Sequence, residues 1–282
     1  MREYASAEGF RAAVETKLRD HARHLGVATY AVRRQAALER LLVRLMRTAP
    51  NRWALKGGLA LETRLGARAR VSLDLDAEHA AGIDAARMDL QRAAAADVGD
   101  HFAFALTGQT SITDGDVAMA VRFTLESNLA GRRFEPLQVD VTVATPDPWD
   151  GQPATRPGLL SVLGLAPIDV LLIPIERQVA EKLHAYTRSY RGGGTTRGRD
   201  LVDLLLIHAH ETNDPERLAR AIQTTFERRA THPVPAALPP PPRELAVSYR
   251  RDASPVGVAA TLDDAHRELA SWIDPILQRL QP

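Results

Sequence analysis

The 282-residue chain contains no cysteine. Disulfide bonds, thiolate metal ligands and a cysteine nucleophile are therefore excluded. No apolar run approaches the roughly 18 residues needed for a membrane-spanning helix. The charged segment 1–11 also lacks the apolar core of a signal peptide. These absences predict a cytoplasmic protein with no membrane partner.

Lysine is almost as scarce, because the chain has 3 lysines against 33 arginines. Two of the three, Lys56 and Lys182, fall inside the motifs described below. The patterns G-x-S-x-G, G-x-x-x-x-G-K-[ST] and H-E-x-x-H are absent from the sequence. The serine-hydrolase, P-loop and zinc-peptidase classes therefore have no support. The length allows one large domain or two modest ones.

The net charge of +1 conceals strong segregation along the chain. Residues 1–70 carry 15 basic and 6 acidic side chains, a balance of +9, and residues 71–170 carry 6 and 15, a balance of −9. A basic face beside an acidic centre suits a metal-dependent enzyme that acts on RNA or DNA. The alternative is that the N-terminal arginines only solvate helix faces.

Hydrophobic periodicity predicts helices first, then a set of strands, then more helices. Helices are expected at 6–24, 29–48, 58–65, 84–98, from Pro174 to about 190, from Asp200 onward, and at 214–229 and 262–280. Strands are expected at 52–55, 71–76, 102–106, 117–125 and 137–144. Connections are expected at 145–167, 191–199 and 233–242. We therefore expect N-terminal helices with a small mixed sheet over 1–165, and a mainly helical domain over 166–282.

The stretch from Lys56 to Asp76, K-G-G-L-A-L-E-T-R-L-G-A-R-A-R-V-S-L-D-L-D, carries the first chemical motif. A glycine pair, Gly57 and Gly58, precedes a helix, which allows close backbone approach and offers N–H donors to a phosphate. Asp74 and Asp76 would share one face of the expected strand. Two adjacent carboxylates repel unless a cation lies between them, and oxygen-only pairs suit Mg²⁺. The stretch predicts nucleotidyl or phosphoryl transfer.

The second motif is E-K-L-H-A, starting at Glu181, followed by R-D-L-V-D-L, starting at Arg199. Lys182 could hold a triphosphate as a point charge. Asp203 lies among leucines and valine, so it needs a cationic partner such as Lys182 or Arg188. Two alternatives remain open: Lys182 and Asp203 could form a buried ion pair that orders two helices, and Asp200 could be only a helix N-cap.

Together the motifs resemble those of polymerase-beta-like nucleotidyltransferases, and among them the AbiEii/AbiGii toxin family, which includes the MenT toxins. The likeness rests on K-G-G-x-A-L, then R-x-S-x-D-[IL]-D from Arg70 to Asp76, then E-K-L-x-A and R-D-L-x-D-L. The resemblance implies an α/β fold with a polymerase-beta-like nucleotidyltransferase core. It also implies that a mainly helical C-terminal domain completes the active-site cleft.

The resemblance also implies roles for individual residues. Mg²⁺ or Mn²⁺ would be held by Asp74 and Asp76. The catalytic set would comprise Asp74, Asp76, Lys182 and Asp203, and the NTP would be bound by Gly57, Gly58, Ser72, Lys182 and Asp200. Asp140, in L-Q-V-D-V-T-V, is the candidate third metal ligand, because an unpaired Asp between apolar neighbours is costly. Its alternative is a surface-facing position on an edge strand.

The implied activity is that of a toxin that transfers a nucleoside monophosphate from an NTP to an RNA hydroxyl, with the tRNA 3′ end as the leading acceptor. A cognate antitoxin would be its protein partner. Candidate RNA contacts are the basic N-terminal region and Arg191, Arg197 and Arg199 of R-G-G-G-T-T-R-G-R. Transfer to a protein Ser, Thr or Tyr hydroxyl is one alternative. A non-catalytic protein that binds a nucleotide or a partner is another, although it would not need to keep mutually repelling carboxylates.

Overall fold

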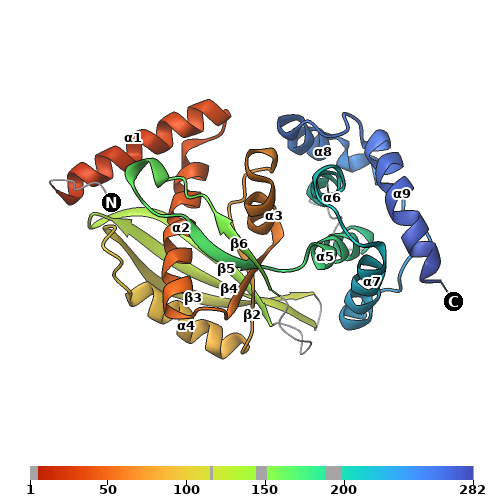
Figure 1. The fold of residues 1–282 in the computed structure, drawn as a ribbon, viewed down its shortest axis with the longest axis horizontal. Coiled ribbons are helices and arrows are strands. Elements are labelled where there is room, and N and C mark those ends of the chain that lie inside the picture. The colour runs from red at the N-terminus through yellow and green to blue at the C-terminus, as the bar shows by residue number, and fades with distance from the viewer. Residues whose placement is uncertain (1–5, 115–116, 144–150, 189–197, 282) are drawn as a thin grey trace. The chain divides into compact units, whose positions relative to one another are not determined.

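The computed structural model describes residues 6–114, 117–143, 151–188 and 198–281. The chain divides into two compact units. We call Met1–Arg64 together with Val71–Leu172 the sheet unit, and Leu65–Arg70 together with Ile173–Pro282 the helical unit. Figure 1 shows the elements of both units.

The sheet unit contains helices and strands in an α/β arrangement, as the sequence predicts. Its elements are α1 (Ala7–Leu25), α2 (Thr29–Thr48), β1 (Trp53–Lys56), α3 (Gly57–Leu65), β2 (Leu75–His79), α4 (Ile83–Ala95), β3 (Phe102–Asp114), β4 (Val117–Leu129), β5 (Arg132–Val143), β6 (Gln152–Arg156), a short 3₁₀ turn η2 (Ser161–Leu163) and β7 (Ile168–Leu172).

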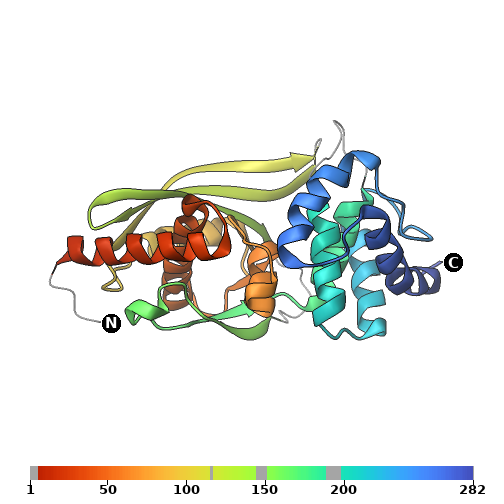
Figure 2. The same cartoon turned by 90° about the horizontal axis from the view of Figure 1, so that it is seen from above.

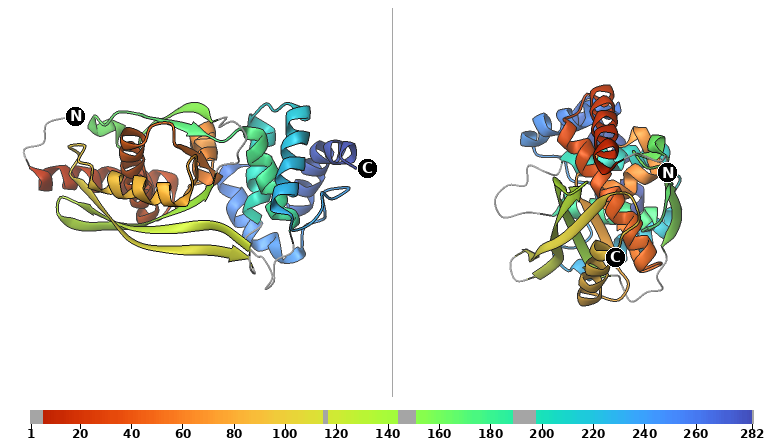
Figure 3. Two further views of the ribbon diagram at one scale, coloured as in Figure 1. Left: turned by 90° about the horizontal axis from the view of Figure 1, so that it is seen from below. Right: turned by 90° about the vertical axis from the view of Figure 1, so that its left-hand side faces the viewer.

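The described strands form one mixed seven-stranded sheet in the order β3-β4-β5-β2-β1-β7-β6. The β2–β5 and β1–β7 pairs are parallel, and the other pairs are antiparallel. Helix α2 contacts β3, β5 and β7, so the sheet curves around this helix. Figures 2 and 3 show α1, α2 and α4 on the face of the sheet that α2 contacts.

Apolar residues at helical spacing account for this packing. The predicted core positions Phe10, Val14 and Leu18 of α1 are buried, and so are Leu38, Leu41, Leu42 and Leu45 of α2. They form one cluster with every second residue of the central strands, including Leu55, Leu75, Phe123 and Val139. Since successive strand residues point to opposite faces, the intervening residues of these strands lie on the other face of the sheet.

The predicted bounds of the strand at 71–76 are wrong, because β2 runs from Leu75 to His79. β1 ends at Lys56, opposite Asp76, since α3 begins at Gly57. The chain before Leu75 therefore has no continuation of β1 beside it. Asp74 precedes the strand, and Asp76 is inside it, so the argument that both share a strand face does not hold.

Two strands were not expected from the sequence. β6 lies within the stretch predicted to be a connection, and β7 follows directly after that stretch. They pair with each other, and β7 also pairs with β1. Short segments of this kind are stabilised as strands by their neighbours in the sheet rather than by their own propensity.

The helical unit contains α5 (Ile175–Thr187), α6 (Gly198–His210), α7 (Pro215–Arg229), α8 (Ala246–Ala253), α9 (Leu262–Arg279) and the 3₁₀ turns η1 (Gly66–Arg68), η4 (Arg243–Leu245) and η5 (Ser254–Val256). α5 contacts α6 and α7, and α6 contacts α8 and α9. Asp214 caps α7, and Thr261 caps α9. No helix in the described part of the chain is long and apolar enough to cross a membrane.

Candidate active site

Four charged residues form a row across four neighbouring strands of the sheet unit. Lys56 of β1 is in register with Asp76 of β2, and Asp76 is in register with Asp140 of β5. Asp140 is in register with Arg122 of β4. Residues in register on adjacent strands project from the same face, so the row reads cation, carboxylate, carboxylate, cation. It lies on the face opposite the helices, because its strand neighbours are buried in the helix-side core.

Gly57 holds the backbone against the carboxylate of Asp76. Its φ of 60° lies in the left-handed region, and a Cβ built there would lie 2.9 Å from Cγ of Asp76 and closer still to Oδ2. Glycine is required at this position both by conformation and by space. The next residue, Gly58, is buried in the first turn of α3, where helix N–H groups lack intrahelical acceptors. The predicted glycine pair therefore adjoins the predicted carboxylate Asp76.

Ser72 and Asp74 lie in the chain that leads into β2. Ser72 is buried, and its Oγ donates to the backbone carbonyl of Asp74 at 3.2 Å. In this structure the hydroxyl thus fixes the local backbone at Asp74. Its predicted role toward a nucleotide stays a prediction.

Asp140 is held by an arginine on the neighbouring strand β4. Arg122 donates from Nε to Oδ1 at 2.7 Å and from Nη2 to Oδ2 at 2.6 Å. These hydrogen bonds, together with the charges of Asp140, Asp74 and Asp76, raise the pKa of Arg122 against a smaller opposing effect of burial. The guanidinium is therefore within electrostatic reach of all three predicted metal-site carboxylates.

The carboxylates of Asp74, Asp76 and Asp140 are the candidate ligands for Mg²⁺ or Mn²⁺. Within the described residues, no three His, Asp or Glu side chains converge into a ready-made metal cage. Both oxygens of Asp140 are engaged by Arg122, which leaves Asp74 and Asp76 as the carboxylate donors. Mg²⁺ is commonly held by one or two carboxylates plus substrate phosphates and water. The residues fit an ion that binds together with its nucleotide.

The helical unit contains a second charged cluster around Asp203 of α6. Arg70 donates from Nε and Nη2 to the two carboxylate oxygens, both at 2.9 Å, and Lys182 Nζ lies 2.5 Å from Oδ2. The Asp203 side chain is 0% exposed. Burial alone would raise the pKa of Asp203, but Lys182 and Arg70 outweigh it and hold the pKa below its ordinary value. Because both oxygens are engaged, Asp203 can position the two cations but is not open to a substrate.

Lys182 projects from α5 and is nearly buried, with 9% of its side chain exposed. Oδ1 of Asp200 lies 3.8 Å from its Nζ. Because α6 begins at Gly198, Asp200 lies inside the first turn, so the alternative that it is the N-cap is wrong. The ion pair between Lys182 and Asp203 that the sequence left as an alternative is present and joins α5 to α6. A role for Lys182 toward the nucleotide stays a prediction.

The predicted RNA contacts are only partly visible. Arg191 and Arg197 lie outside the described residues. Arg199 lies on α6 rather than in a loop, 54% of its side chain is exposed, and its Nε is 3.3 Å from Oδ2 of Asp252.

Some of the charge segregation along the sequence is balanced by ion pairs inside the sheet unit. Arg40 and Arg44 of α2 bind Asp100 at 2.6 and 2.7 Å, and Arg44 is fully buried. Other arginines of the basic segment pair in the same way with the acidic segment: Arg33 with Glu135, and Arg52 with Asp89. The balance of +9 in residues 1–70 therefore overstates the basic charge that this segment leaves for a ligand. These arginines also do more than solvate helix faces.

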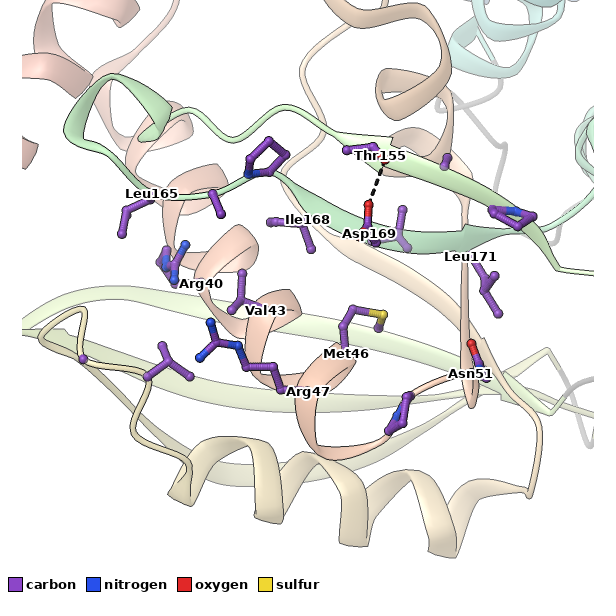
Figure 4. A pocket seen from close by; sticks show the side chains of 18 of the residues that line it. Arg40, Val43, Met46, Arg47, Asn51, Thr155, Leu165, Ile168, Asp169 and Leu171 are labelled. Atoms are coloured by element: carbon purple, nitrogen blue, oxygen red, sulfur yellow. Dashed lines mark hydrogen bonds between the residues drawn. The ribbon is translucent and has the colours of Figure 1, made fainter. Parts of the chain in front are cut away.

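A cavity of about 1040 Å³ in the sheet unit lies away from this chemistry (Figure 4). It is lined by α2 residues such as Val43, Met46 and Arg47, and by β7 residues such as Ile168 and Leu171. It opens on the helix side of the sheet, and none of its described lining residues is a predicted site residue. The cavity therefore does not coincide with the predicted site residues.

The sequence did not indicate that Arg122 binds Asp140, or that Arg70 binds Asp203. Arg70 was visible as part of R-x-S-x-D-x-D, but its partner Asp203 lies 133 residues away. Arg122 is one arginine among 33 and lies in no motif. A signal existed in the strand alternation, which places Arg122 with Thr124 and away from Phe123.

The chain is similar to known proteins both in sequence and in fold. The sequence model of the family described as "Nucleotidyl transferase AbiEii toxin, Type IV TA system" matches residues 40–271. Among solved structures, the chain is similar to MenT4, a nucleotidyltransferase toxin from Mycobacterium tuberculosis H37Rv, with 22% sequence identity and a TM-score of 0.57. That match covers 93% of this chain and 98% of the other. No curated protein matches the chain closely enough to count as a relative.

Proposed function

The chain belongs to the AbiEii family of nucleotidyl transferase toxins of type IV toxin–antitoxin systems, and from that membership we propose how its residues carry out the reaction. It is a nucleotidyltransferase of the toxin class, with an NTP as substrate and an antitoxin as partner. We propose that it transfers a nucleoside monophosphate to an acceptor hydroxyl and releases pyrophosphate.

The observation that carries this proposal is the close approach of Asp76, a member of the charged row, to the backbone at Gly57. Asp74 and Asp76 would hold Mg²⁺ or Mn²⁺, with Asp140 as a further ligand once it is released by Arg122. The ion, when bound, supplies positive charge at the phosphates and lowers the pKa of the attacking hydroxyl. The N-terminus of α3, with Gly57 and Gly58, supplies N–H donors for a phosphate group.

The second cluster would bind the triphosphate. Lys182 supplies the compact positive charge, and Asp203 acts as a positioning residue that holds Lys182 and Arg70. Ser72 and Asp200 complete the proposed nucleotide contacts. Both clusters lie within residues 40–271, which the family model matches, and this supports assigning both to one reaction.

In the proposed reaction the acceptor oxygen bonds to the α-phosphorus of the NTP. The bond from that phosphorus to the α–β bridging oxygen breaks, and pyrophosphate leaves with the electron pair. The hydroxyl proton passes to solvent. Positioning and electrostatic stabilisation supply most of the catalysis in such transfers.

We propose RNA, with the tRNA 3′ end first, as the acceptor, and the cytoplasm as the location. The proposal is supported by the toxin class of the family and by the arginine-bearing segment 191–199. The basic N-terminal region stays a further candidate for RNA contacts, although four of its arginines are engaged in ion pairs inside the sheet unit.

The catalytic proposal is tested by Asp76→Asn in the purified protein, assayed with each α-labelled NTP over total RNA and total protein. Asp76→Asn keeps the size of the side chain but removes its charge, so transfer should fall by at least about 10³-fold while the fold is retained. Near-normal transfer by this variant would show that the carboxylate is not part of the site.

The acceptor proposal is tested by digesting the labelled product. Label on RNA is lost to ribonuclease and kept after protease treatment. Acceptor affinity should also fall steeply with salt concentration, as phosphate contacts release counterions. Label that resists ribonuclease and is lost to protease would overturn the RNA proposal in favour of a protein hydroxyl.

A further inference from the structure

The ion pair between Arg122 and Asp140 differs from the structural ion pairs of the sheet unit. The Arg44–Asp100 pair is sealed in the core, with side chains 0% and 1% exposed. The side chains of Arg122 and Asp140 are 38% and 15% exposed, and the pair lies beside Asp76 in the charged row. Solvent and ligands can therefore reach the guanidinium of Arg122.

Asp140 and Asp76 are in register on parallel strands, which lie roughly 4.8 Å apart. Like charges directly opposite each other are destabilising unless a cation compensates. In the free protein Arg122 supplies that compensation by engaging both oxygens of Asp140. The same planar fork that fits a carboxylate also fits a phosphate group.

We propose that Arg122 exchanges partners when the nucleotide binds. Its guanidinium leaves Asp140 for a phosphate group of the NTP, and Asp140 becomes a third oxygen ligand for the divalent ion. This inference rests on the proposed function, because it needs a metal ion at Asp76. It makes Arg122 a nucleotide-binding residue that also keeps the free protein from binding the ion tightly.

The exchange has a consequence for ligand binding. Without nucleotide, a divalent ion competes with Arg122 for Asp140 and binds weakly. With nucleotide, Arg122 binds a phosphate group and Asp140 is free to bind the ion. The nucleotide and the ion therefore raise each other's affinity for the protein. Removing Arg122 should therefore change the two affinities in opposite directions.

The test is Arg122→Ala in the full chain, with free Mn²⁺ measured by electron paramagnetic resonance in the absence of nucleotide. Mn²⁺ affinity should rise about three- to tenfold, the usual strength of a partly exposed bidentate pair. The double variant Arg122→Ala/Asp140→Asn should lose that gain. In the presence of Mg²⁺, affinity for an NTP analogue that cannot be cleaved at the α-phosphate should fall about tenfold in Arg122→Ala.

Two further variants control this experiment. Arg133 and Glu126 form an exposed pair on the same two strands at 3.5 Å, outside the row. Arg133→Ala should leave both affinities unchanged. Arg122→Gln keeps the aliphatic stem and a polar head, and it replaces Arg122→Ala if far-UV circular dichroism shows that the alanine variant is not folded.

An unchanged or weaker Mn²⁺ affinity in both Arg122 variants would overturn the exchange, and so would unchanged affinity for the NTP analogue. Asp76→Asn separates this outcome from failure of the proposed function. If Asp76→Asn abolishes Mn²⁺ binding and the Arg122 variants have no effect, the exchange alone is wrong. If Asp76→Asn leaves Mn²⁺ binding unchanged, the metal site itself is wrong.

Discussion

An Asp203→Ala substitution removes the carboxylate that Arg70 and Lys182 share in the helical unit. The wild-type carboxylate accepts hydrogen bonds from Arg70 at 2.9 Å on each oxygen, and a further one from Lys182 at 2.5 Å. In the variant both cations lose this partner, while Lys182 retains Asp200 at 3.8 Å. The cations remain largely buried, since their side chains are 21% and 9% exposed.

Breaking a buried ion pair by removing one partner costs about 3–5 kcal/mol. Water reaches part of Arg70, so we expect the lower end of this range, about 3 kcal/mol. The pKa of Asp203 is lower in the folded protein than in the unfolded chain. Its contribution to stability is therefore complete above the unfolded pKa of about 3.9 and is lost as the pH falls through the folded pKa. The free energies of unfolding of wild type and variant should therefore differ by the full amount at pH 7 and become equal in strong acid.

The assay is hydrogen–deuterium exchange of the amides of α5 and α6, which carry Lys182 and Asp203. The free energy of local opening should fall by about 3 kcal/mol there and stay unchanged in α2 of the sheet unit. Arg199→Ala is the matched control, because it breaks an exposed pair with Asp252 in the same unit. A loss in Asp203→Ala below about 1 kcal/mol, the usual value for exposed pairs, would refute the reasoning.

The remaining predictions concern the glycine contact, a buried carboxyl and the nucleotide lysine. Gly57→Ala should cost about 1–2 kcal/mol of backbone strain and also weaken Mn²⁺ binding, because its Cβ displaces Asp76; calorimetry measures both. Gly66→Ala has a similar φ of 59° with nothing within 4 Å of its Cβ, so equal loss of Mn²⁺ binding would contradict this explanation. Burial raises the pKa of Glu39 to about 7 against the attraction of Arg156, so the folded state holds a proton that the unfolded chain releases near pH 4.5. The free energy of unfolding of the wild type should fall relative to that of Glu39→Gln as the pH rises from about 5 to about 7. Urea unfolding at several pH values measures it, and a constant difference between the two proteins across that window would contradict the prediction. Lys182→Arg should bind NTP more weakly by calorimetry, because a planar fork does not replace a compact ammonium, and wild-type affinity would leave Lys182 a structural residue.

Local sequence patterns were sufficient for much of the fold. The apolar spacing of Phe10, Val14 and Leu18 predicted α1, and the leucines of the next segment predicted α2. The α/β class and the toxin family followed from patterns that lie close together in the chain, and both are confirmed. Helices are readable in this way because their contacts repeat every three to four residues.

The strand boundaries could not be predicted from local sequence patterns as the helices could. V-S-L-D-L-D alternates as a strand should, yet β2 begins only at Leu75, and its pairing with β1 ends at Asp76 opposite Lys56. β6 has little apolar pattern of its own and pairs with β7, which in turn pairs with β1. A strand is decided by the chain beside it, and that neighbour is set by the tertiary fold.

The sequence by itself determined which residue types are available for chemistry: the glycine pair, the carboxylates at Asp74 and Asp76, and a lysine in a chain that has few. The tertiary structure decided their partners. Arg70 and Asp203 are 133 residues apart, and Arg122 and Asp140 are brought together by the register of β4 and β5. Asp203 is thereby enclosed by two cations, and Asp140 is covered by an arginine that no motif contains. Charge pairing depends on burial and register, which arise from the sum of many weak contacts across the fold and not from any short segment of the chain.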